Sequence, residues 1–284
     1  MTTEAEIARL VAIGLPGYDV RRVVPLGAGL DNAAYEVNDE LVVRIAREPG
    51  SVGREAELLA RVGAVSPLPV PQPVFVVDEH CLAYWKLTGT PLIDVPIAER
   101  ATYAVAIGAT LGAFLAVLHS SEPGGWAGLV DRDDEPLAAW RDETAELFED
   151  LAGQLSSDQR REVEAFLRAP IPEPAQALVF SHNDLGIEHV LVAEGTDTIT
   201  GIIDWSDAAL CDPARDLGLI LRDLGPAALD AALRDHPRGD LICDRALFYA
   251  RCSLLEDLHF GHETGRTTYV DKSLAALRWL FPLR

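Results

Sequence analysis

The segment VFSHNDLGIEHVLV, residues 179–192, places a polar run between two short apolar runs. Apolar runs of this length are typical of strands, and the run ITGIIDW at 199–205 follows after the polar turn GTDT. The segment therefore predicts a short β-hairpin that presents a polar loop containing two histidines, an aspartate and a glutamate. Such a loop is compatible with a metal site, a hydrolase site or a phosphate-transfer site.

The first 88 residues have a mostly β-type pattern. We expect one helix over 4–13, a strand–loop–strand–turn–strand meander over 20–47, and a second helix over 51–64. Two further strands are expected over 73–77 and 81–87, joined by the turn DEH. These elements predict a small α+β lobe over residues 1–88, which we treat as the first domain.

From about residue 98 the pattern becomes mainly helical. Apolar spacing predicts one long helix over 99–120 and two amphipathic helices over 136–155 and 157–170. Helices resume at Pro213 after the predicted hairpin. Residues 89–284 are thus expected to form a hinge and a larger, mainly helical lobe with an embedded β-hairpin.

Charge and composition exclude several classes of partner. The formal net charge is -21 at pH 7, so nucleic acid and anionic membranes would be repelled. We also expect no membrane-spanning helix and no secretory signal, which makes the cytoplasm the predicted location. The four cysteines are far apart and are expected to be reduced thiols. The acidic excess lies mostly beyond residue 90, where it serves solubility or concentrates a cationic substrate.

The spacing of His182, Asp184, position 189 and Asp204 resembles the catalytic and metal segments of the aminoglycoside (antibiotic) phosphotransferase family, within the choline-kinase-like superfamily. The family pattern is H-x-D-x-x-x-x-N, then an apolar strand and I-D-[WF]. Other matching segments appear in the same order: LGAGLDNAAYEV, LVVRIAR, GREAELL, LGAFLAVLH and DWSDAALCDPARDLG. The resemblance implies a bilobal protein-kinase-like fold, ATP or GTP as phosphate donor, Mg²⁺ as cofactor, and a small-molecule hydroxyl as acceptor.

The resemblance also implies roles for individual residues. Asp184 would align and deprotonate the acceptor hydroxyl, because phosphoryl transfer depends mainly on positioning and charge neutralisation. Asp204 would ligate Mg²⁺ through oxygen. Arg44 stands where the family has a phosphate-binding lysine, with Glu55 as its expected partner and Glu57 as the alternative. The remaining nucleotide contacts would come from Gly27, Gly29, Lys86 and Leu87.

Position 189 departs from the family pattern, because His189 replaces the metal-binding asparagine. Imidazole is a poor ligand for Mg²⁺ and favours transition metals, so Mn²⁺ is an alternative and Glu188 is an alternative oxygen ligand. His182 is expected to brace the loop backbone rather than act as a base. Asp212 and Asp216 are expected to cap the next helix and brace the loops.

The substrate-binding residues are predicted from the acidic second lobe. Asp207, Glu256, Asp257 and Glu263 are the candidates for holding a cationic acceptor, although a solvated helix face explains such acids equally well. The predicted function is phosphorylation of an aminoglycoside, macrolide or tuberactinomycin antibiotic, which would confer resistance, by a monomer or weak dimer. The alternatives are a metabolic kinase for choline, a sugar or a fructosamine, and a nucleotide-binding pseudokinase.

Overall fold

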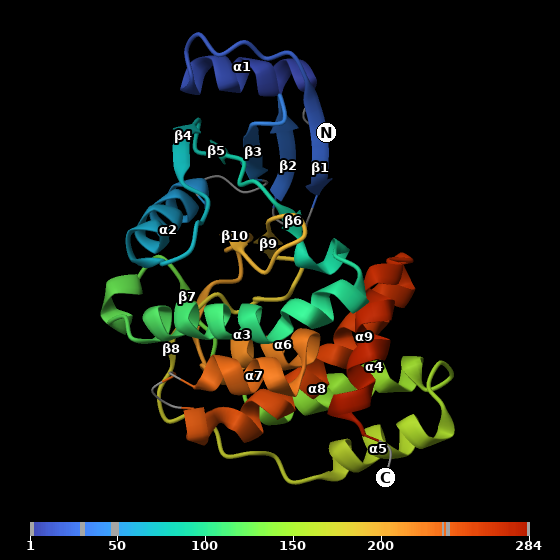
Figure 1. Ribbon diagram of the computed structural model, residues 1–284. Helices are drawn as coiled ribbons and strands as arrows, with labels where there is room; N and C mark the ends of the chain where they lie inside the picture. Colours follow the sequence, from blue (N-terminus) through green and yellow to red (C-terminus); the bar gives the residue numbers. More distant parts are fainter. Residues whose placement is uncertain (1–2, 29–31, 47–50, 235, 237–238, 283–284) are drawn as a thin grey trace.

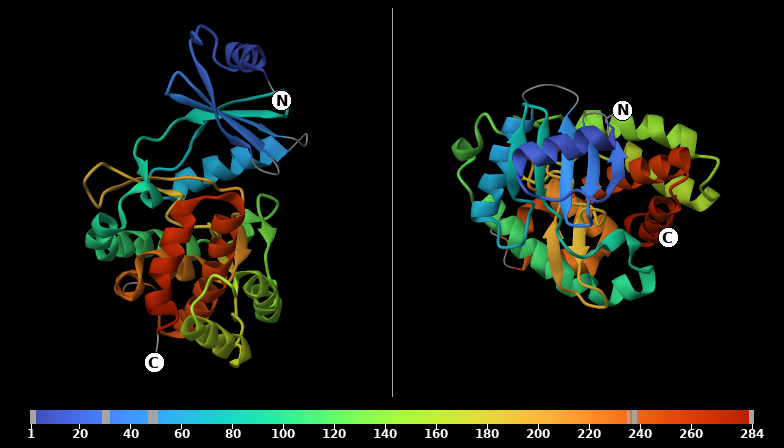
Figure 2. Two further views of the ribbon diagram at one scale, coloured as in Figure 1. Left: turned by 90° about the vertical axis from the view of Figure 1, so that its right-hand side faces the viewer. Right: turned by 90° about the horizontal axis from the view of Figure 1, so that it is seen from above.

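The computed structural model describes residues 3–28, 32–46, 51–234, 236 and 239–282. It has an antiparallel sheet in its N-terminal part and a helical C-terminal part, as Figure 1 shows. The α+β class predicted from the sequence is therefore confirmed. The left view of Figure 2 shows the N-terminal sheet above the C-terminal helices.

Five strands form the N-terminal sheet, in the order β1-β2-β3-β5-β4. Every neighbouring pair in it is antiparallel. The strands are β1 (Val23–Ala28), β2 (Asn32–Val37), β3 (Leu41–Ala46), β4 (Pro73–Val77) and β5 (Cys81–Trp85). Helix α1 (Glu4–Gly14) packs on this sheet through Ile7, Leu10 and Val11, and α2 (Ser51–Val65) contacts β4 and β5. The predicted meander and both helices are thus confirmed.

The connector after β5 leads into the C-terminal part. Strand β6 (Thr90–Pro91) pairs with β9 (Val190–Val192), which also pairs with β10 (Ile199–Ile202), the other strand of the predicted hairpin. The chain therefore leaves the five-stranded sheet after Trp85 and joins the second sheet at Thr90. The domain boundary near residue 88 remains a proposal. A third sheet joins β7 (Asp131–Arg132), β11 (Ala209–Cys211) and β8 (Val179–Ser181). The sequence pattern did not predict β6, β7 or β11.

The C-terminal part otherwise consists mainly of helices. They are α3 (Ile97–His119), α4 (Leu137–Leu151), α5 (Ser157–Arg168), α6 (Ala214–Leu224), α7 (Pro226–Leu233), α8 (Gly239–Thr264) and α9 (Thr267–Leu280), with 3₁₀ turns η1 (Leu92–Asp94) and η2 (Pro123–Trp126). Figure 1 places α5 at the end of the molecule farthest from the N-terminal sheet.

Helix α3 corrects the expectation that no segment is long and apolar enough to span a membrane. By length and hydropathy Ile97–His119 passes that test. The helix is nevertheless part of the core: an added Cβ at Gly108 or Gly112 would meet the α7 backbone oxygens of Ala228 and Ala232 at 2.4 and 2.2 Å. Such close approach of two helices requires glycine. We therefore interpret α3 as a core helix.

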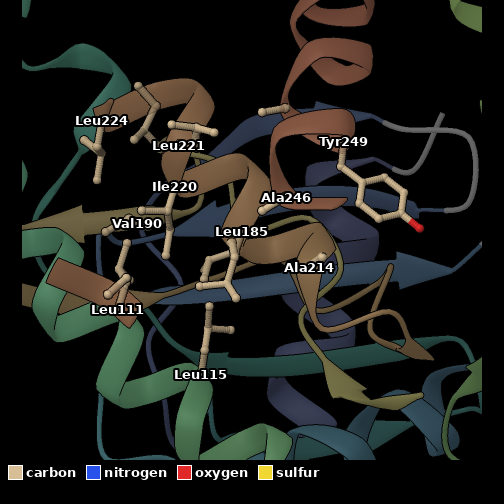
Figure 3. Packing of buried hydrophobic residues seen from close by; sticks show 14 of the residues in the cluster. Leu111, Leu115, Leu185, Val190, Ala214, Ile220, Leu221, Leu224, Ala246 and Tyr249 are labelled. Carbon is tan, nitrogen blue, oxygen red and sulfur yellow. The ribbon is translucent and has the colours of Figure 1, made fainter. Parts of the chain in front are cut away.

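The main core lies directly behind the polar loop between β8 and β9. In Figure 3 the loop residue Leu185 lies among Leu111 and Leu115 of α3, Ala214 of α6 and Ala246 of α8. All of these side chains are buried. Because a close-packed core resists displacement, Leu185 anchors the polar loop to the helices beneath it.

Candidate active site

The loop after β8 carries Asp184 in a fixed backbone conformation. The carboxylate of Asp216 at the start of α6 accepts hydrogen bonds from the backbone N–H groups of Asn183 at 3.1 Å and Leu185 at 3.2 Å. Asn183 has φ 70°, a left-handed conformation that asparagine tolerates better than most residues. Asp184 itself keeps 41% of its side chain exposed. The loop is thus rigid while its carboxylate remains accessible.

His182 braces this loop, as the sequence predicted. Its Nδ1 accepts a hydrogen bond from the Asp184 N–H at 3.3 Å, so its Nε2 carries the proton and donates to the Ile203 carbonyl at 3.0 Å. Burial lowers the pKa of His182, which agrees with this neutral form. Asp212 likewise accepts a hydrogen bond from the Ala214 N–H at 2.9 Å, and so satisfies a backbone donor at the start of α6.

His189 connects the two aspartates on which the predicted chemistry depends. Its Nδ1 lies 2.8 Å from the Asp184 carbonyl oxygen and 3.4 Å from Asp184 Oδ2. Its Nε2 faces Asp204 Oδ2 at 3.8 Å. Burial favours the neutral ring, but the Asp184, Glu188 and Asp204 carboxylates outweigh it and raise the pKa of His189.

Asp204 lies two residues beyond β10 and has φ 59°, an uncommon conformation for aspartate that is often found at functional sites. Its Oδ1 accepts a hydrogen bond from Ser206 Oγ at 2.6 Å. Burial would raise the pKa of Asp204, but His189, the Ser206 hydrogen bond and Arg44 together lower it. The carboxylate is therefore ionised and oriented at neutral pH.

The metal-ligand hypothesis fits this geometry in part. The Nδ1–H of His189 donates to a backbone carbonyl, an arrangement that orients the imidazole of metal-binding histidines and leaves Nε2 toward Asp204. Within the described part of the chain, no group of three or more His, Cys, Asp or Glu side chains is arranged to hold a metal ion. A cation held by Asp204 and His189 would therefore need nucleotide phosphates to complete its shell, which is how Mg²⁺ usually binds.

Arg44 approaches the same site from the N-terminal sheet. Its NH1 lies 2.9 Å from Glu55 Oε1 on α2 and 3.8 Å from Asp204 Oδ1. Tyr84 on β5 also hydrogen-bonds with Arg44, and burial raises the pKa of Tyr84 to about 12. Of the two glutamates considered from sequence, Glu55 is thus the partner, whereas Glu57 faces Arg61 on its own helix at 3.8 Å.

The structure describes three of the four other residues predicted to contact the nucleotide. Gly27 lies near the end of β1, and a Cβ added there would meet nothing within 4 Å, while Gly29 falls outside the described residues. Lys86 donates its backbone N–H to the Glu40 carbonyl at 2.8 Å and pairs through Nζ with Glu36. Leu87 lies on the connector beside Gly201 of β10.

Two of the predicted substrate residues lie within electrostatic reach of Asp184. Burial, together with Asp184 and Asp204, raises the pKa of Asp207. Burial, Asp257 and Asp184 raise the pKa of Glu256 on α8, and Glu143 on α4 contributes in the same direction. The sequence analysis missed Glu143, because only the fold brings α4 to this place.

The other two predicted substrate residues are Asp257, which is paired inside the protein, and Glu263, which is exposed. Asp257 is buried and paired with Arg222 at 2.8 Å and Lys272 at 2.9 Å, so we no longer propose it as a substrate contact. Glu188 likewise pairs with Lys272 at 2.9 Å, which removes it as the alternative metal ligand. Glu263 is exposed and lies about two turns beyond Glu256 on α8.

The fold and the loop together are those of a kinase-like phosphotransferase, with a β-rich N-terminal part above a helical part that carries Asp184 and Asp204. The sequence model of the phosphotransferase enzyme family matches residues 22–248, and the chain belongs to this family. It is therefore a phosphotransferase, as the sequence resemblance implied.

Similar proteins include several antibiotic kinases. A viomycin phosphotransferase of Streptomyces vinaceus is 30% identical over 104 residues, which is 35% of this chain and 36% of the length of that relative. The GDP complex of aminoglycoside 2'-phosphotransferase-IIIa superposes with a TM-score of 0.71 at 21% identity and covers 97% of each chain. Macrolide 2'-phosphotransferase MphH from Brachybacterium faecium superposes with a TM-score of 0.60 at 24% identity, over 95% of this chain and 97% of the other. Both structures establish the shared fold.

Proposed function

We propose that the protein transfers the γ-phosphate of ATP or GTP to a hydroxyl group of a small cationic antibiotic. One observation carries the proposal: the His189 ring lies between the Asp184 and Asp204 carboxylates, at 3.4 and 3.8 Å. His189 thereby fixes the distance between Asp184, the proposed base for the acceptor hydroxyl, and Asp204, the proposed ligand of the metal ion. Phosphoryl transfer requires this arrangement, because positioning and charge neutralisation supply most of its catalysis.

In this mechanism each side chain has a defined task. Asp184 orients the acceptor hydroxyl and accepts its proton during attack on the γ-phosphate. Arg44, held by Glu55 and Tyr84, donates hydrogen bonds to the nucleotide phosphates. Asp204 and His189 would hold the metal ion, which when bound neutralises phosphate charge.

A cationic acceptor is supported by the crowding of carboxylates around Asp184. Asp207 and Glu256 both have raised pKa values, caused by burial first and by neighbouring carboxylates second. A bound ammonium group would relieve this repulsion. The names of the similar proteins include viomycin, aminoglycoside and macrolide kinases, so these three antibiotic classes form the first panel of acceptors. We place the reaction in the cytoplasm, where ATP and GTP are available.

The direct test is mass spectrometry after incubation with ATP or GTP and with Mg²⁺ or Mn²⁺. The acceptors are aminoglycosides, macrolides, tuberactinomycins and choline. One added phosphate on an antibiotic supports the proposal. A product with choline alone would replace it with a metabolic kinase, and bound nucleotide without any product would favour the pseudokinase.

We expect the variants Asp207→Asn and Glu256→Gln to raise the KM for a cationic acceptor by about 3- to 10-fold each, with a small change in kcat. The reason is that removing one carboxylate within electrostatic reach of Asp184 removes attraction that acts before and during the reaction alike. Steady-state kinetics with the phosphorylated antibiotic measures both constants. Asp230→Asn, an exposed carboxylate on α7, is the matched control, and an equal change in that variant would contradict the assignment.

We expect His189→Asn to shift metal preference toward Mg²⁺, lowering the ratio of activity with Mn²⁺ to activity with Mg²⁺ by about tenfold. An amide oxygen suits Mg²⁺ better than imidazole does. The ratio is measured at saturating nucleotide over a titration of each metal. An unchanged ratio would remove His189 from the metal site.

A further inference from the structure

Five charged side chains form a buried cluster beneath the catalytic loop, which we call the charge cluster. They come from four separate parts of the chain: Glu188 from the loop, Arg222 and Asp223 from α6, Asp257 from α8, and Lys272 from α9. The mechanism proposed above uses none of them. Figure 1 shows α6, α8 and α9 side by side in the helical part, and their contacts confirm this packing.

Lys272 occupies the middle of the charge cluster. Its Nζ lies 2.9 Å from Glu188 Oε2, 2.9 Å from Asp257 Oδ2 and 3.5 Å from Asp223 Oδ1. Only 3% of the residue is exposed. Burial and the nearby Arg222 would lower the pKa of Lys272, but the three carboxylates outweigh them and raise it. The ammonium group is therefore charged at neutral pH and has three carboxylates around it.

Arg222 completes the charge cluster from the side of α6. Its NH1 lies 2.8 Å from Asp257 Oδ2, and its NH2 lies 2.8 Å from Asp223 Oδ2 and 3.8 Å from Glu188 Oε1. The carboxylates of Glu188, Asp223 and Asp257 are thus paired with the basic side chains of Arg222 and Lys272. Buried ion pairs often contribute little net stability compared with apolar residues of similar size. A stabilising role alone therefore does not account for this arrangement well.

The charge cluster is joined to the catalytic loop at two adjacent positions. Asp223 Oδ2 accepts a hydrogen bond from the Ile187 N–H at 3.2 Å. Lys272 holds the side chain of the next residue, Glu188, and the residue after that is His189. His189 in turn donates from Nδ1 to the Asp184 carbonyl at 2.8 Å. A continuous set of contacts thus runs from α9 to the catalytic aspartate.

We propose that Lys272 is a positioning residue for phosphoryl transfer: through Glu188 it fixes the backbone at residues 187–189, and so the placement of His189 against Asp184 and Asp204. This inference rests on the proposed function of those three residues. It assigns a role in the reaction to helix α9, whose Lys272 lies 84 residues beyond Glu188 in the sequence.

The test compares Lys272→Met, Lys272→Arg, Glu188→Gln and the double variant Lys272→Met with Glu188→Gln. We expect Lys272→Met and Glu188→Gln each to lower kcat by about 10- to 100-fold, the range seen when groups supporting catalytic ligands are removed. The nucleotide KM should stay within about threefold, because Arg44 and Glu55 are untouched. Lys272→Arg should recover most of the kcat. The double variant should lose no more than the worse single variant, because both act through one contact.

The control is Trp279→Phe, which removes the 2.9 Å hydrogen bond from α9 to the Leu221 carbonyl without touching the charge cluster. Its kcat per folded molecule should stay near that of the wild type. Additive losses in the double variant, or a kcat for Lys272→Met within about twofold of the wild type, would overturn the proposal. If Lys272→Met does not fold, Glu188→Gln and the charge-balanced double variant decide the result.

A second measurement separates this inference from the proposed function. Hydrogen exchange at the backbone amides of Ile187 and His189 should be faster in Lys272→Met than in Trp279→Phe. Each variant is measured the same number of degrees below its own melting temperature. Equal exchange would overturn the positioning role, whatever the activity. A wild-type protein that phosphorylates no acceptor, but shows the expected exchange difference, would refute the proposed function and leave the structural coupling established.

Discussion

Asp184→Asn is expected to lower kcat by about 10³-fold, within the range typical of a positioned general base. This loss corresponds to about 4 kcal/mol of transition-state stabilisation. Asparagine keeps the size of the side chain and the hydrogen bonds that the loop backbone donates to His182 and Asp216. It cannot accept the proton of the acceptor hydroxyl. The loss should therefore appear in kcat rather than in nucleotide affinity.

The measurement combines steady-state kinetics with calorimetric titration of the nucleotide. We expect the nucleotide Kd of Asp184→Asn to stay within about threefold of the wild type, since the substitution leaves the Arg44–Glu55 pair proposed to hold the nucleotide phosphates unchanged. Retention of more than about a tenth of wild-type kcat would contradict the role of Asp184 as base.

Asp204→Asn is expected to lower kcat by about 10²-fold or more, and to raise the metal concentration needed for half-maximal activity. A neutral amide supplies one oxygen but no charge, and a metal ion contributes several kcal/mol of charge stabilisation in such reactions. Asparagine is the suitable replacement because it tolerates the left-handed conformation found at this position, φ 59°. Folding should therefore be preserved.

Titration with the metal ion shows whether Asp204 binds the metal directly or only contributes negative charge near it. If Asp204 is a ligand, excess Mn²⁺ or Mg²⁺ should recover part of the lost rate. Ser206→Ala, which removes only the 2.6 Å hydrogen bond to Asp204 Oδ1, should have a much smaller effect. A metal requirement unchanged in Asp204→Asn would remove this residue from the site.

The sequence predicted the strands and helices whose pattern extends over five residues or more. The meander over β1 to β3, the strands β4 and β5, and the helices α2 to α5 all have a periodicity that a short window detects. Strands β6, β7 and β11 are two or three residues long. Tertiary pairing decides these three strands, whereas the equally short β8 and β9 were predicted from the apolar runs on either side of the polar loop.

The catalytic loop could be located from its spacing, but the roles of its charged residues could not all be assigned. The sequence allowed both Glu55 and Glu57 as partners of Arg44. Two residues along a helix are separated by about 200°, so only one of them can face the sheet, and packing of α2 selects Glu55. Glu188 was similarly considered as a metal ligand, until the fold brought Lys272 against it.

The sequence by itself determined the fold class, the loop from His182 to His189, and Asp204 at the end of its strand, because local periodicity and spacing encode them. The tertiary structure alone decided which acids lie within electrostatic reach of Asp184 and which are neutralised inside the protein. Asp257 and Glu256 are adjacent on α8, yet one pairs with Lys272 and the other lies within reach of Asp184. The physical reason is that the environment of a charge depends on side chains that the folded chain brings from distant positions, and local sequence does not specify them.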